Sequence, residues 1–148
     1  GMAFANPKKR IYCINGDGGF HMAVQSMLLI SQYNLNIKVI VMNNESLGMI
    51  TQFQHLYFED RMAGTTANGG YLIPDMQSIA DAYGFRYKQM DESKLTSDDL
   101  NDDGFCLIDY HIDGLTTVSP KLEYNKPIDR PIPLLLEEEY KLIYFKGI

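Results

Sequence analysis

The chain has 148 residues, of which 45% are hydrophobic and 22% are charged, and its formal net charge is −6. A chain of this length and apolar content can bury a core, which excludes an intrinsically disordered protein. The negative charge argues against nucleic acid as a partner, and no apolar run reaches the ~20 residues of a membrane span.

Apolar and amphipathic stretches alternate along the chain. In chain order, they predict a strand at 11–14, a helix at 20–33, a strand at 37–42, a helix at 47–58, a loop at 61–74, a helix at 74–82, a strand at 85–89, a helix at 93–100 and a strand at 105–110. The run at 37–42 is continuous and rich in β-branched residues, which is typical of a strand covered on both faces. We therefore expect an α/β fold of three layers, a parallel sheet with helices on both faces.

The pattern changes after residue 114. Prolines interrupt any regular element in the remaining chain: Pro120, Pro127, Pro131 and Pro133. We divide the chain into an α/β domain at 1–114 and an extended, Pro-rich arm at 115–148. The opening residues 3–5 resemble the last turn of a helix, so we expect the α/β domain to be incomplete at its N-terminus.

The cysteines and histidines are further candidates for function. Cys13 and Cys106 lie in apolar runs, which is typical of buried, reduced thiols and favours a cytoplasmic protein over a disulfide-stabilised one. His21 follows a glycine-rich turn and either contacts a phosphate or lies on the surface at the start of a helix. His55 is expected to be exposed or at an interface, and His111 follows a buried strand without an evident partner.

The most informative motif is Gly16-Asp17-Gly18-Gly19, between a predicted strand and a predicted helix. A glycine-rich turn in this place directs backbone N–H groups and the positive end of a helix dipole at a phosphate. The motif is not a dinucleotide fingerprint, because position 21 is His rather than Gly, and it lacks the Lys-Ser/Thr pair of a P-loop. Asp17 would repel a phosphate unless a cation such as Mg²⁺ joined the two. The turn therefore predicts a phosphate bridged by a metal ion.

A second metal ligand is expected at Asn43-Asn44, where the next predicted strand ends. The 24 residues between Gly18 and Asn43 suit one helix and one returning strand of a right-handed crossover, which brings both strand ends to the same edge. Asparagine is a neutral oxygen ligand that Mg²⁺ accepts where phosphate supplies the charge. Either motif alone is as well explained by structure, Asp17 as a helix cap and the Asn pair as a turn. The two together at this spacing favour a metal site.

These motifs resemble those of a known family. Gly-Asp-Gly followed by Asn-Asn resembles the thiamine diphosphate signature, and residues 44–54, NESLGMITQFQ, resemble its acetolactate synthase branch. Residues 59–61 and 79–85 resemble the same branch, so the resemblance covers about 3–120. It implies the C-terminal, diphosphate-binding domain of a thiamine diphosphate-dependent lyase or transferase, in a truncated form of that fold. The implied cofactors are thiamine diphosphate and Mg²⁺, and the implied reaction is decarboxylation or carboligation of a 2-keto acid.

The resemblance also implies a set of cofactor-binding positions, on the turn and after the second strand: Gly16, Asp17, Gly18, Gly19, Phe20, Asn44, Ser46, Leu47, Gly48, Met49 and Ile50. Asp17 and Asn44 would bind Mg²⁺ through their side chains, and Ser46 through its backbone carbonyl. The amides of 18–20 would hold the diphosphate. Residues 47–49 would lie near the middle of the cofactor, and Ile50 would face the thiazolium and the substrate.

One position departs from the acetolactate synthase branch. Those synthases that resemble this chain carry Trp at position 53, on the substrate-facing helix, whereas this chain carries Phe53 and has no Trp. The prediction therefore concerns a class, a carboligase or decarboxylase of 2-keto acids, rather than acetolactate synthesis itself.

The resemblance further implies that other polypeptide is needed for catalysis. In the family, cofactor activation depends on a glutamate from a separate pyrimidine-binding domain, usually on another subunit, and 148 residues hold no such domain. We expect no catalytic residue in this chain, no activity of the chain alone, and either a homo-oligomer or a partner chain carrying the pyrimidine-binding domain. Two alternatives are a non-catalytic association module of the same fold and a subunit of a split enzyme.

Overall fold

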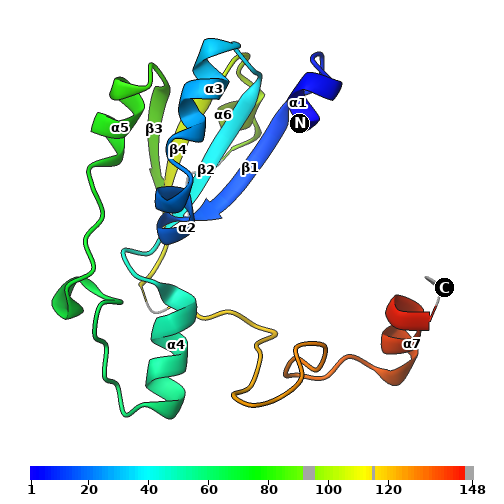
Figure 1. The fold of residues 1–148 in the computed structure, drawn as a ribbon. Helices are drawn as coiled ribbons and strands as arrows, with labels where there is room; N and C mark the ends of the chain where they lie inside the picture. The colour runs from blue at the N-terminus through cyan, green and yellow to red at the C-terminus, as the bar shows by residue number, and fades with distance from the viewer. Residues whose placement is uncertain (92–95, 115, 146–148) are drawn as a thin grey trace.

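A computed structural model describes residues 1–91, 96–114 and 116–145 of the chain. It has a layered α/β body and an arm that runs away from this body to the C-terminus (Figure 1). The described residues form a four-stranded sheet in the order β1-β2-β4-β3, in which all neighbouring strands are parallel. The strands are β1 (Ile11–Gly16), β2 (Ile37–Asn43), β3 (Arg86–Asp91) and β4 (Cys106–His111).

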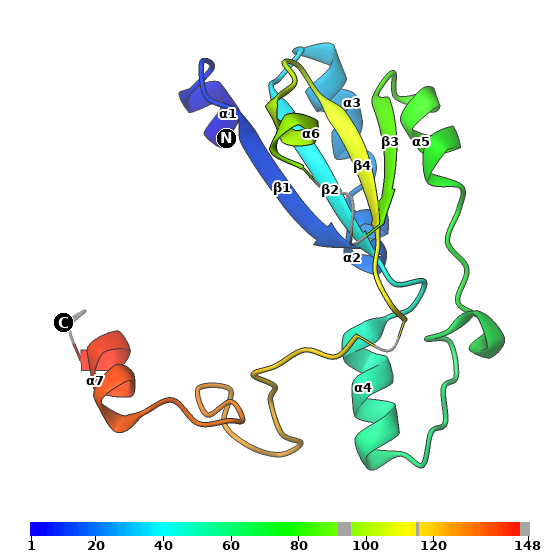
Figure 2. The ribbon, with the colours of Figure 1, turned by 180° about the vertical axis from the view of Figure 1, so that it is seen from behind.

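Helices lie on both faces of this sheet. Figures 1 and 2, which view the molecule from opposite sides, show α2, α3 and α5 on one face and the short α6 on the other. The helices are α1 (Met2–Ala5), α2 (Asp17–Met22), α3 (Ser26–Gln32), α4 (Gly48–Tyr57), α5 (Met76–Ala82), α6 (Ser97–Asn101) and α7 (Glu137–Phe145), with a 3₁₀ turn η1 (Ala67–Gly69). The predicted fold class, a parallel α/β sheet covered on both faces, is confirmed.

The sheet has a buried apolar cluster on each face. One cluster joins β2 and β4 to the larger helical layer: Phe20, Met27, Val39, Val41, Met76, Ala80, Phe85 and Leu107. The other lies on the α6 side: Ile40, Met90, Cys106 and Ile108. Because alternate residues of a strand face opposite layers, β2 has to be apolar on both sides, which explains its continuous apolar run.

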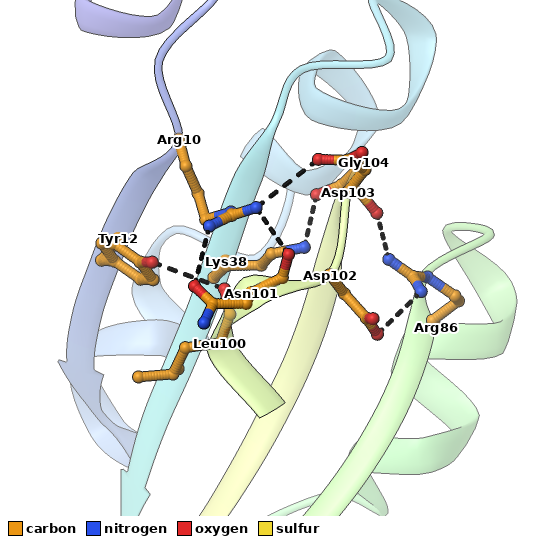
Figure 3. A network of polar contacts seen from close by, with 9 residues as sticks. All are labelled: Arg10, Tyr12, Lys38, Arg86, Leu100, Asn101, Asp102, Asp103 and Gly104. Atoms are coloured by element: carbon orange, nitrogen blue, oxygen red, sulfur yellow. Dashed lines mark hydrogen bonds and ion pairs between the residues drawn. The ribbon is translucent and has the colours of Figure 1, made fainter. Parts of the chain in front are cut away.

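Charged residues close the amino edge of the sheet, as Figure 3 shows. Lys38 of β2 is fully buried, and its Nζ donates a hydrogen bond to the carbonyl oxygen of Gly104 at 2.8 Å. Burial lowers the pKa of Lys38. Arg86 at the start of β3 forms an ion pair with Asp102 at 3.1 Å. These contacts hold the α6–β4 connection against the starts of β2 and β3, at the end of the sheet opposite to the predicted site.

The single helix predicted at 20–33 is wrong. The chain forms α2, which already begins at Asp17, and then α3, with a turn at 23–25 between them. The amide and the hydroxyl of Ser26 both donate to the carbonyl oxygen of Ala23, at 2.9 and 2.6 Å. Such local hydrogen bonds compete with those of a continuous helix, so the chain turns instead.

The arm contains a helix that was not predicted. The prolines end at Pro133, and α7 follows. Its first turn carries the carboxylates of 137–139, which stabilise the positive end of a helix dipole. The prediction of an arm extended over its whole length is therefore wrong at α7.

The two cysteines differ in burial. Cys106 is buried as predicted, whereas Cys13 is exposed and its prediction is wrong. The reason is that Cys13 lies on β1, an edge strand, and the helices on its side lie over β2, β4 and β3 (Figure 1). The other strand and helix predictions agree with the observed elements to within a few residues. The helix predicted at 93–100 overlaps α6, and 92–95 lie outside the described residues.

Candidate cofactor site

The glycine-rich turn and the Asn pair lie together at the carboxyl edge of the sheet. β1 and β2 pair in parallel with Gly16 opposite Met42, so both strands end at the same level. Beyond these ends lies a cavity of about 340 Å³. It is lined by residues from β1, α2, β2, the turn between β2 and α4, the start of α4, the end of β4 and the arm: Gly16, Asp17, Gly18, Gly19, Met42, Asn44, Ser46, Leu47, Gly48, Met49, Ile50, Ile112, Thr116 and Val118.

Nearly all of the residues predicted to bind the cofactor line this cavity. Phe20 does not, because its side chain is buried in the core against α3 and β2, although its prediction concerned the backbone amide. Ile112, Thr116 and Val118 were not predicted. Their position just beyond the carboxyl end of β4 is the signal that could have identified them, since ligands of parallel sheets bind at that edge.

The glycine at position 18 lets the turn lie close to the side chains of Leu47 and Tyr71. A Cβ atom there would collide with Cδ2 of Leu47 and would lie 3.3 Å from the hydroxyl oxygen of Tyr71. Gly16, in contrast, has no atom within 4 Å of where its Cβ would be. The glycine-rich turn therefore packs directly against the segment that follows β2.

Asp17 is the buried charged group of the cavity. Its side chain is 2% exposed, and its Oδ1 accepts a hydrogen bond from the amide of Gly18 at 2.7 Å. Burial raises the pKa of Asp17, and the hydrogen bond from Gly18 opposes this effect. The Oδ2 atom is buried and has no hydrogen-bond partner among the described residues. A buried carboxylate oxygen without a partner fits a site for a cation.

Tyr71 faces Asp17 from the loop that follows η1. Burial and the negative charge of Asp17 raise the pKa of Tyr71 to about 12, so its hydroxyl stays protonated at neutral pH. A protonated phenol is a neutral neighbour that leaves the carboxylate as the charged group at this point.

The Asn pair forms a tight turn into α4. Asn44 lines the cavity, and its Oδ1 accepts a hydrogen bond from the amide of Ser46 at 3.3 Å. Between them Glu45 has a positive φ of 54°, a left-handed conformation that reverses the chain. Ser46 is buried, and its Oγ has no partner among the described residues. A Cβ atom on Gly48 would lie 2.7 Å from Nδ2 of Asn44, so glycine there leaves room for the Asn44 amide.

The start of α4 and the arm form the outer wall of the cavity. Met49 and Ile50 are half exposed in the first turn of α4. One turn later the ring of Phe53 lies 5.4 Å from that of Tyr57, which in turn lies 5.9 Å from that of Tyr124 on the arm. The substrate-facing helix of the sequence prediction is therefore in contact with the arm through aromatic side chains.

The histidines occupy different places. His21 is at the end of α2 and does not line the cavity. His55 is exposed as predicted, and its Nδ1 lies 2.6 Å from Oδ1 of Asp60. His111 has a partner that the sequence did not reveal, because its Nε2 lies 3.0 Å from Oδ2 of Asp109.

The donor set of the cavity suits a metal ion that also takes ligands from phosphate. Among the residues that the structure describes, no three His, Cys, Asp or Glu side chains gather in a metal-binding group. Asp17 offers one carboxylate, while Asn44 offers a neutral oxygen. Mg²⁺ is commonly bound by one or two carboxylates together with phosphate oxygens and water. Thiamine diphosphate and Mg²⁺ therefore fit the residues present.

The family follows from comparison with known proteins. Residues 1–110 match the family described as thiamine pyrophosphate enzyme, C-terminal TPP binding domain. The chain belongs to this family. This TPP-binding domain is 33% identical over 142 residues to the acetolactate synthase large subunit of Lactococcus lactis subsp. lactis (strain IL1403), covering 94% of the chain and 24% of that protein. It is 34% identical over 124 residues to the acetolactate synthase isozyme 2 large subunit of Escherichia coli (strain K12), covering 81% of the chain and 22% of that protein.

A solved structure shows the same fold. The TPP-binding domain is similar to a thiamine diphosphate-dependent 4-hydroxybenzoylformate decarboxylase of Rhodococcus jostii RHA1, with a TM-score of 0.59 and 21% identity, over 74% of the chain and 21% of that protein. At this identity the likeness concerns the fold alone. The chain spans less than a quarter of the length of the relatives named above. In its described part no helix is long and apolar enough to cross a membrane.

Proposed function

We propose that this TPP-binding domain binds thiamine diphosphate through a bridging Mg²⁺ ion, as part of an acetolactate synthase-like enzyme that acts on 2-keto acids. The observation that carries the proposal is the Asp17 carboxylate, which is buried at the glycine-rich turn with one oxygen unpartnered. Leaving a carboxylate oxygen in this state is costly, and a bound cation removes the cost. The similarity to proteins named acetolactate synthase supports the class of enzyme.

Three residues of the cavity are the proposed metal ligands. Asp17 and Asn44 would contribute side-chain oxygens, and Ser46 its backbone carbonyl. The Asn44 carboxamide already lies in the cavity with its Oδ1 held by the Ser46 amide. One carboxylate with two neutral oxygens leaves a net positive charge on Mg²⁺, which would attract the diphosphate.

The rest of the cofactor would follow the cavity wall. We propose that the amides of 18–20 hold the diphosphate oxygens, because they stand in the first turn of α2, where N–H groups have no backbone carbonyl to bind within the helix. The Gly18 amide, which donates to Asp17 in this structure, would turn to the diphosphate when Asp17 binds the metal ion. Residues 47–49 would contact the middle of the cofactor, and Ile50 would face the thiazolium and the substrate. When bound, thiamine diphosphate would supply a nucleophilic carbon that adds to the 2-keto acid and a thiazolium ring that takes up the electron pair released with CO₂.

The substrate would be selected on α4. Phe53 is one turn beyond Met49 and Ile50, so an aromatic ring takes the position at which the resembling synthases carry Trp. Phenylalanine has a smaller ring and no indole N–H donor. Phe53 itself does not line the cavity, and its ring lies against Tyr57, so we propose the class of reaction, decarboxylation or carboligation of a 2-keto acid, without a particular side chain of the substrate.

Catalysis would require a second domain. We propose that the pyrimidine-binding domain comes from another copy in a homo-oligomer or from a partner chain, as in a split enzyme, and that the isolated chain is inactive. We also propose that the protein is cytoplasmic, and that residues 1–114 form the cofactor-binding domain and residues 115–148 an arm.

One observation favours the second candidate, a non-catalytic association module. Apolar side chains are exposed on β1 and α1, where Ile14 is 65% and Met2 70% exposed. Exposed apolar patches mark surfaces that bind other polypeptides. Light scattering at micromolar concentration tests this association. We expect an oligomer, and a chain that stays monomeric would show that the apolar surface of β1 and α1 does not bind a second copy.

Isothermal titration of the chain with thiamine diphosphate in the presence of Mg²⁺ tests the primary proposal. We expect weak binding, because the contacts of the pyrimidine-binding domain are absent, and Asp17→Ala should abolish it. Asp81→Ala is the matched control, since Asp81 is exposed on α5 and does not line the cavity. An Asp17→Ala variant that binds as well as the parent chain would overturn the metal assignment.

A further inference from the structure

Asn43 and Asn44 are adjacent in the chain, but their side chains lie in different cavities. Asn44 lines the proposed cofactor cavity. Asn43 lines a second cavity of about 460 Å³ between the carboxyl ends of β2, β4 and β3 and the loop before α5. Asp109 also lines this second cavity, and it does not line the first.

The strand register brings polar groups from three strands to Asp109. Val41 and Gln89 are its partners on β2 and β3, so residues two positions away share its face of the sheet. Asp109 is 4% exposed. Its Oδ1 accepts a hydrogen bond from Nδ2 of Asn43 at 2.9 Å, and its Oδ2 accepts one from the hydroxyl of Tyr87 at 3.0 Å. His111 lies against the same Oδ2 at 3.0 Å.

The side chain of Asn43 connects this carboxylate to the turn that follows β2. While Nδ2 donates to Asp109, Oδ1 accepts a hydrogen bond from the amide of Glu45 at 3.1 Å. Glu45 has the left-handed φ of 54°, which a residue with a side chain rarely adopts without support from its surroundings. The next amide, that of Ser46, is bound to Asn44. One chain of hydrogen bonds therefore runs from Asp109 to the turn that carries the proposed metal ligands.

We infer that Asp109 is a positioning residue for the cofactor site: through Asn43 it fixes the turn at Glu45 and so holds Asn44 and Ser46 in the cavity. This inference rests on the proposed function and goes beyond it, since Asp109 does not line the cofactor cavity and is not one of the proposed metal ligands. The carboxylate suits the task because it accepts from Asn43 with one oxygen while its other oxygen has two neighbours, Tyr87 and His111, so that loss of the Tyr87 hydroxyl leaves His111 in place. Asn43 then has one orientation available, with its own oxygen toward Glu45.

Titration with thiamine diphosphate and Mg²⁺ separates positioning from general stability. Asp109→Leu, which keeps the volume and removes the acceptor, should weaken binding by about tenfold, equivalent to about one hydrogen bond. Asp109→Asn should restore most of the affinity, because its carbonyl oxygen still accepts from Asn43. Tyr87→Phe is the matched control, since it removes another donor to the same carboxylate. The affinity of this variant for thiamine diphosphate should stay within about twofold of that of the parent chain.

A second variant covers the case in which Asp109→Leu does not fold. Asn43→Ala removes the connecting side chain at the end of β2 and should weaken binding as Asp109→Leu does. The double variant should be no weaker than either single one, because both break the same chain of hydrogen bonds. Binding within about twofold of the parent in Asp109→Leu or Asn43→Ala overturns the inference.

NMR spectroscopy tests the inference without the cofactor. In the parent chain the side-chain amide protons of Asn43 should be shifted and protected from exchange, and Asp109→Leu should remove the protection and also shift the Asn44 amide signals. Tyr87→Phe should leave both sets unchanged. If the parent chain binds no cofactor while these signals behave as expected, the proposed function fails and the positioning of the turn stands. If the Asn44 signals do not respond to Asp109→Leu, positioning by Asp109 fails on its own.

Discussion

Gln52 and Val118 exchange two hydrogen bonds across 66 positions of sequence: Nε2 of Gln52 donates to the carbonyl oxygen of Val118, and the Val118 amide donates to Oε1, both at 3.1 Å. The side-chain amide of Gln52 thus pairs with the backbone as a neighbouring strand would. This contact fixes the first part of the arm to α4 and keeps Thr116 and Val118 at the wall of the cofactor cavity.

Loss of this pair should release the arm. Gln52→Ala should increase the rate of tryptic cleavage after Lys121, which Leu122 follows, by about threefold or more, because local opening exposes this site to the protease. Gln77→Ala on α5 is the control, since Gln77 is exposed far from the arm. Equal cleavage rates in parent and Gln52→Ala would show that the pair does not hold the arm.

The glycines of the turn should differ in their tolerance of alanine. Gly18→Ala forces a methyl group against Leu47 and Tyr71 and should lower the free energy of unfolding by about 1–3 kcal/mol. Gly16→Ala meets no atom within 4 Å and should leave stability nearly unchanged. Urea denaturation followed by circular dichroism measures both. Adding Leu47→Ala to Gly18→Ala should recover part of the lost stability, because it removes the side chain that the new methyl group meets. If the double variant recovers nothing, Leu47 is not the residue with which the methyl group collides.

The core of the sheet should be sensitive at Leu107. This side chain is fully buried on β4 between the strands and the larger helical layer, so Leu107→Ala should lower the free energy of unfolding by about 2–5 kcal/mol. Leu28→Ala on α3 is the matched control, because Leu28 is 60% exposed and should change stability by no more than about 0.5 kcal/mol. Equal losses in the two variants, measured by chemical denaturation, would contradict the assignment of the core.

The cap of α5 should make stability depend on pH. The hydroxyl and the amide of Ser78 both donate hydrogen bonds to the Asp75 carboxylate. These bonds, above all that of the hydroxyl, hold the pKa of Asp75 below its ordinary value of 3.8. A group whose pKa is lowered by folding stabilises the folded state above its ordinary pKa, and this contribution is lost as the pH falls through the lowered value. Asp75→Asn retains a cap whose oxygen does not titrate. The difference in Tm between parent and Asp75→Asn should therefore shift in favour of the variant between about pH 6 and about pH 2, and a constant difference would refute the prediction.

The sequence predicted the parts of the molecule whose conformation depends on a few neighbouring residues. The continuous apolar run of β2 indicates a buried strand, and the Gly-Asp-Gly motif indicates a tight turn, each within a few residues. The crossover rule then brings the ends of β1 and β2 together, which is why the residues expected around the cofactor do line one cavity. The family and the fold class follow from the same signals.

The parts that were missed depend on side-chain contacts that the spacing of apolar residues does not indicate. Asp109 stands only two residues before His111, but alternate residues of a strand meet only if their side chains turn toward each other, which the sequence alone does not show. The contact of Val118 with Gln52 arises because the arm folds back over α4. The break after α2 was hidden because the apolar spacing continues through the turn that Ser26 stabilises.

The position of β1 has a consequence for handling the protein. β1 pairs with β2 on one side, and it is the terminal strand in the order of the described sheet. A strand of this kind offers a row of backbone donors and acceptors on which another strand can assemble, and 65% exposure of the Ile14 side chain adds an apolar surface beside it. Additional polypeptide that continued the sheet past β1 would turn this strand into an interior one. Without such a covering strand, β1 is where fibrillar aggregation of the chain would start.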